Sequence, residues 1–262
     1  MSFTLCLAQT GYPSNGDVVL LVESIAKRAQ QQGATLLAFP ENLMHPRELS
    51  NAELALLAEP LDGPFVQAIC AIAQRYELSI AFTTNETNPA GDPPYNTALL
   101  AGSNGTIAAT YRKCHLYDAH GTRESDRMTA GSKLCQPIRT PFCTIGLGIC
   151  YDLRFPEVAR SLALGGSELL LFPAAWHNGP NKAMHWKTLL RARAIENECF
   201  VAGVCHGASR YVGQSFVFDP MGNEVAGGTD ELLTCVIDPK EVDAARSNMP
   251  VFAHRKPELY TT

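Results

Sequence analysis

The sequence predicts an α/β fold in which strands are packed between helices. Short apolar segments alternate with amphipathic segments of helical period along most of the chain. Strands that are apolar on both faces need a cover on each side, so this pattern indicates sheets with buried faces. The chain shows no short-period repeat, low-complexity tract or linker. We therefore expect one domain over residues 1–262.

The first half of the chain predicts helix-containing units and a hairpin. Apolar residues recur at helical spacing over residues 17–32, and Gly33 follows them. "YNTALLAG" and "TIAATYR" are joined by "SNG", which is a turn sequence. The expected elements are a strand over 3–10, a helix over 17–32, a strand over 34–39, a helix over 64–77, a strand over 78–84 and the two hairpin strands.

The second half of the chain continues the alternation of apolar segments with amphipathic segments of helical period. Pro156 is a favourable first residue for a helix, and Gly165 closes the segment that it begins. Residues 182–197 carry an apolar stripe that includes Trp186. The expected elements are a strand over 141–149, helices over 156–165 and 182–197, strands over 167–172, "CFVAGVC", "QSFVFD" and "LLTCVI", and a helix over 239–247.

Composition excludes several classes of function. Of 262 residues, 46% are apolar and 18% are charged, as in a globular protein with a sizeable core. The net charge is −5 and no basic run reaches five residues, which argues against a nucleic-acid partner. The beginning "MSFTLCLAQTG" lacks a secretory n-region, and no apolar run approaches the roughly 18 residues of a membrane span. We therefore expect a cytoplasmic protein.

Cysteine usage and motif content argue against disulfides, metals and cofactors. The nine cysteines are odd in number and scattered, so we expect free thiols. There is no CxxC and no HExxH, and we expect no metal site. "GLGICY" lacks the third glycine of a dinucleotide fingerprint, and both the phosphate-binding GxxxxGK[ST] and the serine hydrolase GxSxG are missing.

Reactive side chains stand at the ends of three expected strands. Cys150 ends one of them, six residues before Pro156, where a helix N-terminus would stabilise a thiolate. Glu41 directly follows "ATLLAFP", and Lys113 ends "TIAATYRK". Ligands in layered α/β folds collect outside the carboxyl ends of strands, and these ends together would supply a nucleophile, a base and a cation. Taken singly, a buried thiol and solvated charges are the plainer explanation.

Three segments carry a family resemblance. "LLAFPEN", "YRKCHLYD" and "GICYDLRFPE" resemble, in order and rough spacing, the three signatures of the nitrilase superfamily of carbon–nitrogen hydrolases. The resemblance implies a four-layer α-β-β-α sandwich and a homodimer. It assigns Cys150 as nucleophile, Glu41 as general base and Lys113 as stabiliser of the tetrahedral intermediate. Glu124, in "GTRESDR", falls where many members carry a second glutamate that orients the lysine or the substrate; a solvated loop carboxylate is the alternative.

These assignments imply hydrolysis of a small amide through a thioester. A neighbouring carboxylate can take the thiol proton, protonate the departing amine and then activate water. The Lys113 ammonium and the N–H of Tyr151 would hold the oxyanion. The wider "CYDLRFPE", "HLYDAHGTRES" and "FPAAWHNGP" segments resemble the Nit branch that includes deaminated glutathione amidase, a metabolite repair enzyme releasing 2-oxoglutarate and Cys-Gly.

A substrate with carboxylates needs cationic partners. Arg154 is the first candidate because a guanidinium matches a carboxylate bidentately, although it could instead pair with Asp152 or Glu157. Tyr117 and Trp176 either wall the pocket or pack in the core. Further cations on loops expected near the rim, for which simple solvation is the alternative, are Arg123, Arg127 and Lys182.

Three other functions are weighed against this one. An ω-amidase acting on 2-oxoglutaramate or 2-oxosuccinamate would use the same catalytic residues. A catalytically silent dimeric scaffold would be expected to lose one of the reactive groups. A thiol redox factor would need a resolving cysteine, and Cys143 is seven residues back on the same expected strand, too far from Cys150 for a disulfide.

Overall fold

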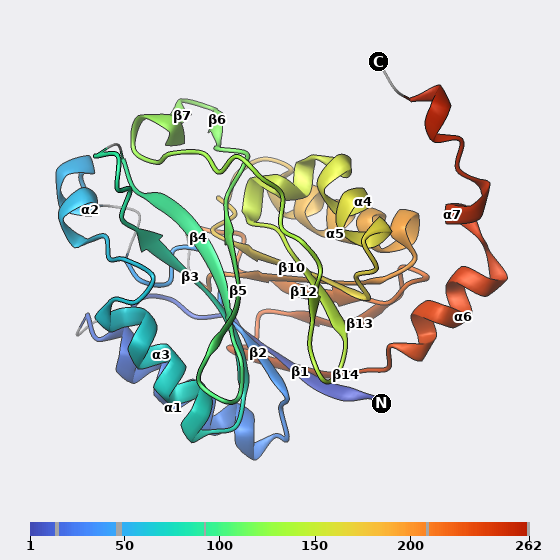
Figure 1. Cartoon of the computed structure of the whole chain (residues 1–262), viewed down its shortest axis with the longest axis horizontal. Helices are drawn as coiled ribbons and strands as arrows, with labels where there is room; N and C mark the ends of the chain where they lie inside the picture. Colours follow the sequence, from blue (N-terminus) through green and yellow to red (C-terminus); the bar gives the residue numbers. More distant parts are fainter. Residues whose placement is uncertain (14–15, 46–48, 92, 208–209, 261–262) are drawn as a thin grey trace.

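A double sandwich of sheets and helices organises the chain (Figure 1). The computed structural model describes residues 1–13, 16–45, 49–91, 93–207 and 210–260. In this described part, two six-stranded sheets pack face to face, and helices cover the outer face of each. The predicted α/β class is therefore confirmed, and the layers follow the order α-β-β-α.

The first sheet comes mainly from the N-terminal half. Its strand order is β14-β1-β2-β3-β4-β5, with β1 to β3 mutually parallel and the other neighbours antiparallel. Helices α1 (Val18–Gln31) and α3 (Pro64–Arg75) cover its outer face. The strands are β1 (Phe3–Ala8), β2 (Leu36–Ala38), β3 (Ser79–Glu86), β4 (Tyr95–Ala101), β5 (Ile107–Arg112) and β14 (Leu232–Ile237).

The second sheet comes from the C-terminal half. Its order is β13-β12-β11-β10-β9-β8, with β9 to β11 parallel and the other neighbours antiparallel. Helices α4 (Pro156–Leu164) and α5 (Lys182–Asn197) cover it. The strands are β8 (Ile138–Arg139), β9 (Thr144–Leu147), β10 (Leu169–Ala174), β11 (Phe200–Cys205), β12 (Ser215–Phe218) and β13 (Glu224–Gly228).

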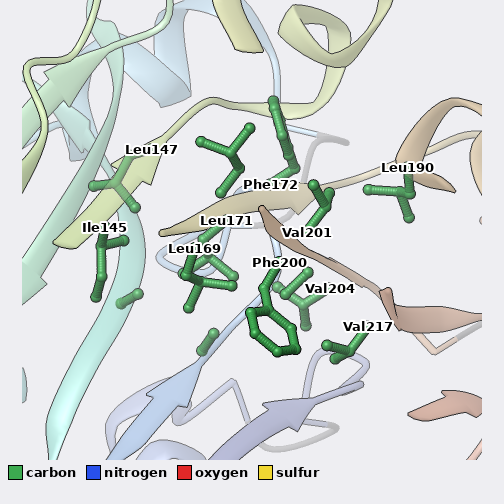
Figure 2. Packing of buried hydrophobic residues seen from close by; sticks show 14 of the residues in the cluster. Ile145, Leu147, Leu169, Leu171, Phe172, Leu190, Phe200, Val201, Val204 and Val217 are labelled. Atoms are coloured by element: carbon green, nitrogen blue, oxygen red, sulfur yellow. The ribbon is translucent and has the colours of Figure 1, made fainter. Parts of the chain in front are cut away.

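The main core lies between the two sheets. Strand alternation divides β1, so that Leu5 and Leu7 face the second sheet while Cys6 and Ala8 face α1 and α3. Figure 2 shows the apolar side chains of β9, β10 and β11 packed beside one another. On the outer side, α5 lies so near β11 that a Cβ added to Gly203 would come within 2.5 Å of Leu190 Cδ1.

Smaller elements complete the chain. The β6–β7 ribbon and the 3-10 turn η1 stand beside the first sheet, and α6 and α7 run along the side of the sandwich toward the C-terminus (Figure 1). Their bounds are α2 (Asn51–Leu57), β6 (Asp118–Ala119), β7 (Thr122–Arg123), η1 (Glu124–Asp126), η2 (Cys150–Arg154), α6 (Lys240–Asn248), α7 (Val251–His254) and η3 (Pro257–Leu259).

The predicted helices are found within a few residues of their expected bounds, and the differences have local causes. The strand expected over 141–149 is confined to Thr144–Leu147, because residues 141–143 form the turn between β8 and β9 and η2 begins at Cys150, just after the last hydrogen bond to β10 at Gly148. Helix α2 was not expected; it buries Leu54 alone and begins at a capping box of Ser50 and Glu53. Strand β13 was also not expected, since its exposed edge sequence "EVAGG" lacks apolar alternation.

Candidate active site

The carboxyl ends of strands from both sheets meet at one buried ionic cluster. The Lys113 ammonium donates to Glu41 Oε1 at 2.7 Å and to both Glu124 oxygens at 2.9 and 2.8 Å. All three side chains are buried, with 2% to 6% of their area exposed. Cys150 lies against the cluster and hydrogen-bonds to Glu41. The structure thus brings together the residues that the strand-end argument singled out.

The backbone fixes each of these groups differently. Lys113 directly follows β5, which runs parallel to β3 after two antiparallel reversals, and so ends at the same edge as β2. Glu41 lies three residues beyond β2, in a turn where Asn42 has the left-handed φ of 58°. Glu124 begins η1 and accepts the Tyr117 N–H at 2.7 Å. The alternative of a solvated loop carboxylate is therefore wrong for Glu124.

Cys150 occupies a strained backbone position. It is the first residue of η2 and has a φ of +45°, which a side chain with a Cβ rarely adopts. The buried Asp152 secures this turn by accepting the Ile149 N–H and the Tyr111 hydroxyl at 2.8 Å each and by contacting His115 Nδ1 at 2.7 Å. Cys150 thus lies at the junction between β9 and α4 that the sequence suggested, three residues beyond the strand and at the start of the 3-10 turn that leads to the helix.

Charge decides the protonation of the cluster. Burial raises the pKa of Glu41, but the Lys113 ammonium and hydrogen bonds from Lys113 and the Ala175 N–H lower it well below its usual range. Burial acts in the opposite direction on Lys113, where Glu124 and Glu41 raise its pKa above the ordinary value. Lys113 therefore stays charged and Glu41 ionised at neutral pH.

The same charges keep the thiol protonated. Burial, followed by the negative charge of Glu41, raises the pKa of Cys150 well above its ordinary value, and Lys113 offsets this only in part. Two carboxylates and one ammonium already leave the cluster with a charge of about −1, so a thiolate would add a second negative charge. The expected stabilisation of a thiolate by a helix N-terminus is therefore wrong for this state. The thiol thus keeps its proton in contact with the ionised Glu41 carboxylate, a group that can accept a proton.

A cavity of about 340 Å³ opens onto the sulfur. Arg154 lies over the Trp176 ring, with Cζ 4.7 Å from its centroid, and Lys182 Nζ is 3.0 Å from the Tyr117 hydroxyl. All four side chains predicted to contact substrate line this cavity, together with Lys113, Cys150 and a further cation, Lys182. Its lining is Lys113, Tyr117, Cys150, Tyr151, Arg154, Ala175, Trp176, His177 and Lys182.

The remaining predicted cations lie elsewhere. Arg123 is 72% exposed and contacts Asp126, while Arg127 lines a separate small cavity behind Glu124. Within the described residues, the ion pairs found do not join Arg154 to Asp152 or Glu157. Of the cations predicted to bind substrate, Arg154 and Lys182 are therefore the two that line the sulfur-containing cavity.

Sequence reasoning missed two groups that hold the Glu41 carboxylate. Asn96 Nδ2 donates to Oε1 at 2.8 Å, and the Ala175 N–H donates to Oε2 at 2.8 Å. Asn96 left a signal, because an amide within the apolar run "YNTALLAG" must find a partner when buried. The Ala175 contact left none, since it is a backbone group from the other sheet.

Comparison with known proteins now identifies the family. Residues 5–247 match the family described as "Carbon-nitrogen hydrolase". The chain belongs to the carbon–nitrogen hydrolase family. This carbon–nitrogen hydrolase is 34% identical over 236 residues to the deaminated glutathione amidase of Escherichia coli O157:H7, with 89% of each chain covered. It is 35% identical over 252 residues to the human enzyme of that name, covering 90% of this chain and 76% of the other.

Solved structures show the same nitrilase superfamily fold. The Caenorhabditis elegans NitFhit protein superposes with a TM-score of 0.90 at 31% identity, covering 99% of this chain and 66% of that one. Yeast Nit3, described as a member of branch 10 of the nitrilase superfamily, gives a TM-score of 0.86 at 26% identity and covers 97% of both chains. The carbon–nitrogen hydrolase is thus similar to Nit-type proteins in both sequence and structure, and it is a hydrolase of non-peptide carbon–nitrogen bonds.

Neither a metal centre nor a membrane span accompanies this site in the residues described. Among them, His, Cys, Asp and Glu form no group of three or more that could hold a metal ion. Across the same residues, every helix is too short or too polar to cross a bilayer.

The strain at Cys150 generates a stability prediction for two variants that lack the thiol. Because glycine adopts positive φ without a Cβ clash, Cys150→Gly should be more stable than Cys150→Ala by about 1 kcal/mol, measured by urea denaturation. Cys114 is a half-buried thiol without positive φ, so there the glycine variant should be the less stable of the pair. A glycine variant that is also the less stable at position 150 would show that the backbone is unstrained.

Proposed function

We propose that this carbon–nitrogen hydrolase is a cysteine-dependent amidase that cleaves deaminated glutathione through a thioester on Cys150. The observation that carries the proposal is the contact of the Cys150 thiol with the Glu41 carboxylate, which in turn binds the Lys113 ammonium at 2.7 Å. The relatives named deaminated glutathione amidase support the substrate. Under this proposal the products are 2-oxoglutarate and Cys-Gly, and the role is metabolite repair.

Each step uses a group already in place. Sulfur attacks the amide carbon while its proton passes to Glu41, and the oxyanion receives hydrogen bonds from Lys113 and the Tyr151 N–H. Glu41 returns the proton to the departing amine as the carbon–nitrogen bond breaks. It then takes a proton from water, which attacks the thioester and releases the acid and the thiol. Glu124 keeps Lys113 charged and oriented throughout.

The lining of the cavity fits a carboxylate-bearing substrate. Arg154 offers a planar fork, and stacking on Trp176 restricts its motion. Lys182 adds a second positive charge held by Tyr117. These cations compensate the negative charge of the buried cluster, which would otherwise repel an anionic substrate.

The size of the cavity favours a second candidate. That empty space of about 340 Å³ includes open solvent, and the enclosed space beside the sulfur is small compared with the roughly 300–1,000 Å³ of small-molecule sites. An ω-amidase acting on 2-oxoglutaramate or 2-oxosuccinamate would place a smaller leaving group there. Deaminated glutathione and 2-oxoglutaramate share one acyl group, so they would form the same thioester and differ only in acylation. The homodimer stays a prediction from the resemblance, the cytoplasmic location stays a prediction from the sequence, and the silent scaffold stays an alternative.

The first test compares these two amides. Deaminated glutathione should give the higher kcat/KM, and rapid quenching followed by mass spectrometry should show a 2-oxoglutaryl adduct on the peptide containing Cys150. Glu41→Gln and Lys113→Ala should each slow turnover by about 10²–10⁴-fold, because each removes a proton-transfer or oxyanion group.

Matched thiol variants control this test. Cys150→Ala should lose both the adduct and the turnover, whereas Cys114→Ala should keep both. Faster turnover of 2-oxoglutaramate would favour the ω-amidase. No adduct from either compound or from a broad panel of amides would favour the silent scaffold.

The second test concerns the cation at the cavity. Arg154→Ala should raise KM for amides that carry a carboxylate by about 10–100-fold, since a charge-assisted hydrogen bond contributes roughly 1.5–3 kcal/mol. KM for a neutral aliphatic amide should change little. Arg123→Ala removes an exposed arginine and serves as the control, with both values unchanged. An equal effect of Arg154→Ala on both substrates would make this arginine structural.

A further inference from the structure

His206 bridges the two sheets directly behind Glu41. It follows β11 of the second sheet and is 1% exposed. Its Nε2 is 2.5 Å from the Glu41 carbonyl oxygen, and its Nδ1 is 2.9 Å from the carbonyl oxygen of Thr10, just beyond β1. One ring therefore connects the ends of two strands of the first sheet to a strand of the second.

This junction matters because the reactive groups come from different sheets. Glu41 and Lys113 follow strands of the first sheet, whereas Cys150 follows β9 of the second. The separation of the sulfur and the carboxylate thus depends on how the sheets meet at this edge. A displacement of about 1 Å in a reacting group can cost about 10²-fold in rate.

Aromatic rings reinforce the contact. The Tyr12 ring stacks on His206 with centroids 5.1 Å apart and planes at 30°, and the Tyr211 ring does so at 5.0 Å and 28°. The Tyr12 hydroxyl donates to the carbonyl oxygens of Asn42 and His45. The His206 ring and the Tyr12 hydroxyl therefore contact the carbonyl oxygens of Glu41 and Asn42. Asn42, with its left-handed φ, is the residue that turns the chain after Glu41.

The protonation state of the His206 ring limits how many hydrogen bonds the ring can donate. Burial lowers the pKa of His206, while the carbonyls of Thr10 and Glu41 and the Glu41 carboxylate act in the opposite direction. The neutral ring has one N–H for two carbonyls. The contact with the Glu41 carbonyl is the shorter, so we assign the N–H to Nε2.

We propose that His206 is a positioning residue that acts through Glu41, and that with Tyr12 it fixes the turn carrying this carboxylate against the sheet carrying Cys150. The proposal rests on the role of Glu41 as general base in the proposed function. It predicts that His206 influences the reaction only while Glu41 can accept a proton.

A double-mutant cycle tests this dependence. The rate of acyl transfer to Cys150 is followed by mass spectrometry under single-turnover conditions in wild type, His206→Leu, Glu41→Gln and the double variant. His206→Leu should slow acylation by about 10–100-fold with KM within about 2-fold of wild type. In the Glu41→Gln background the same change should have no further effect, because the base is already lost.

Conservative variants separate positioning from folding. His206→Gln keeps an amide donor and should restore acylation to within about 5-fold of wild type, and Tyr12→Phe, which removes only the hydroxyl, should slow it by less than His206→Leu. His185→Leu, on α5, is the control for loss of a partly buried histidine and should leave acylation unchanged. If His206→Leu does not fold, His206→Gln and Tyr12→Phe replace it in the double-mutant cycle.

Two results would overturn the positioning role. One is that His206→Leu slows acylation by the same factor in wild type and in Glu41→Gln, which would make the residue merely structural. The other is wild-type acylation in His206→Leu while Glu41→Gln is slow, which would leave the proposed function intact. Wild-type acylation in Glu41→Gln would instead remove the base from the proposed function, and the positioning role with it.

Discussion

A single ammonium group, buried between two carboxylates, organises this site. Lys113 would be costly to bury alone, and so would Glu41 and Glu124, but together they satisfy one another through short charged hydrogen bonds. Removing the ammonium would leave two buried carboxylates uncompensated, and breaking a buried ion pair in this way typically costs about 3–5 kcal/mol. The cluster therefore ties the geometry of the site to the stability of the fold. The charge of the cluster also affects the pKa of the Cys150 thiol.

The double-sheet architecture explains how such a cluster forms. Parallel strands in each sheet end at a common edge, and the loops beyond those ends carry the polar groups. The apolar surfaces between the sheets bring the two edges together. Backbone groups then cross the junction, as when the Ala175 N–H from the second sheet holds the carboxylate of Glu41 from the first. The position of the Glu41 carboxylate is thus a consequence of packing in the main core.

Much of this arrangement could be predicted from the sequence, because its signals are local. Apolar period and turn residues located α1, α3, α4 and α5 closely, and the positions of Glu41, Lys113 and Cys150 beyond apolar segments predicted their meeting. The resemblance of three segments to one family supplied the layer order and pointed to Glu124. The residues expected to wall the cavity also line it.

The rest depends on contacts between distant segments. The positive φ of Cys150 occurs in a turn that Asp152 holds through partners on other elements, so the local sequence did not reveal it. His206 meets Glu41 across 165 positions of sequence, and no local pattern marks that pair. The expectation of a stabilised thiolate was wrong because it considered a nearby helix and not the net charge of a cluster built from remote residues.

The ionisation of the sulfur tests the account most directly. Ultraviolet absorbance of thiolate, recorded as the difference between wild type and Cys150→Ala in the absence of substrate, isolates this thiol from the other cysteines. If the buried charges govern the site, Cys150 contributes no thiolate signal between about pH 7 and 8.5, because its pKa lies above that of a free thiol. A full thiolate signal from Cys150 at pH 7 would contradict the account, since sulfur would then attack without giving its proton to Glu41.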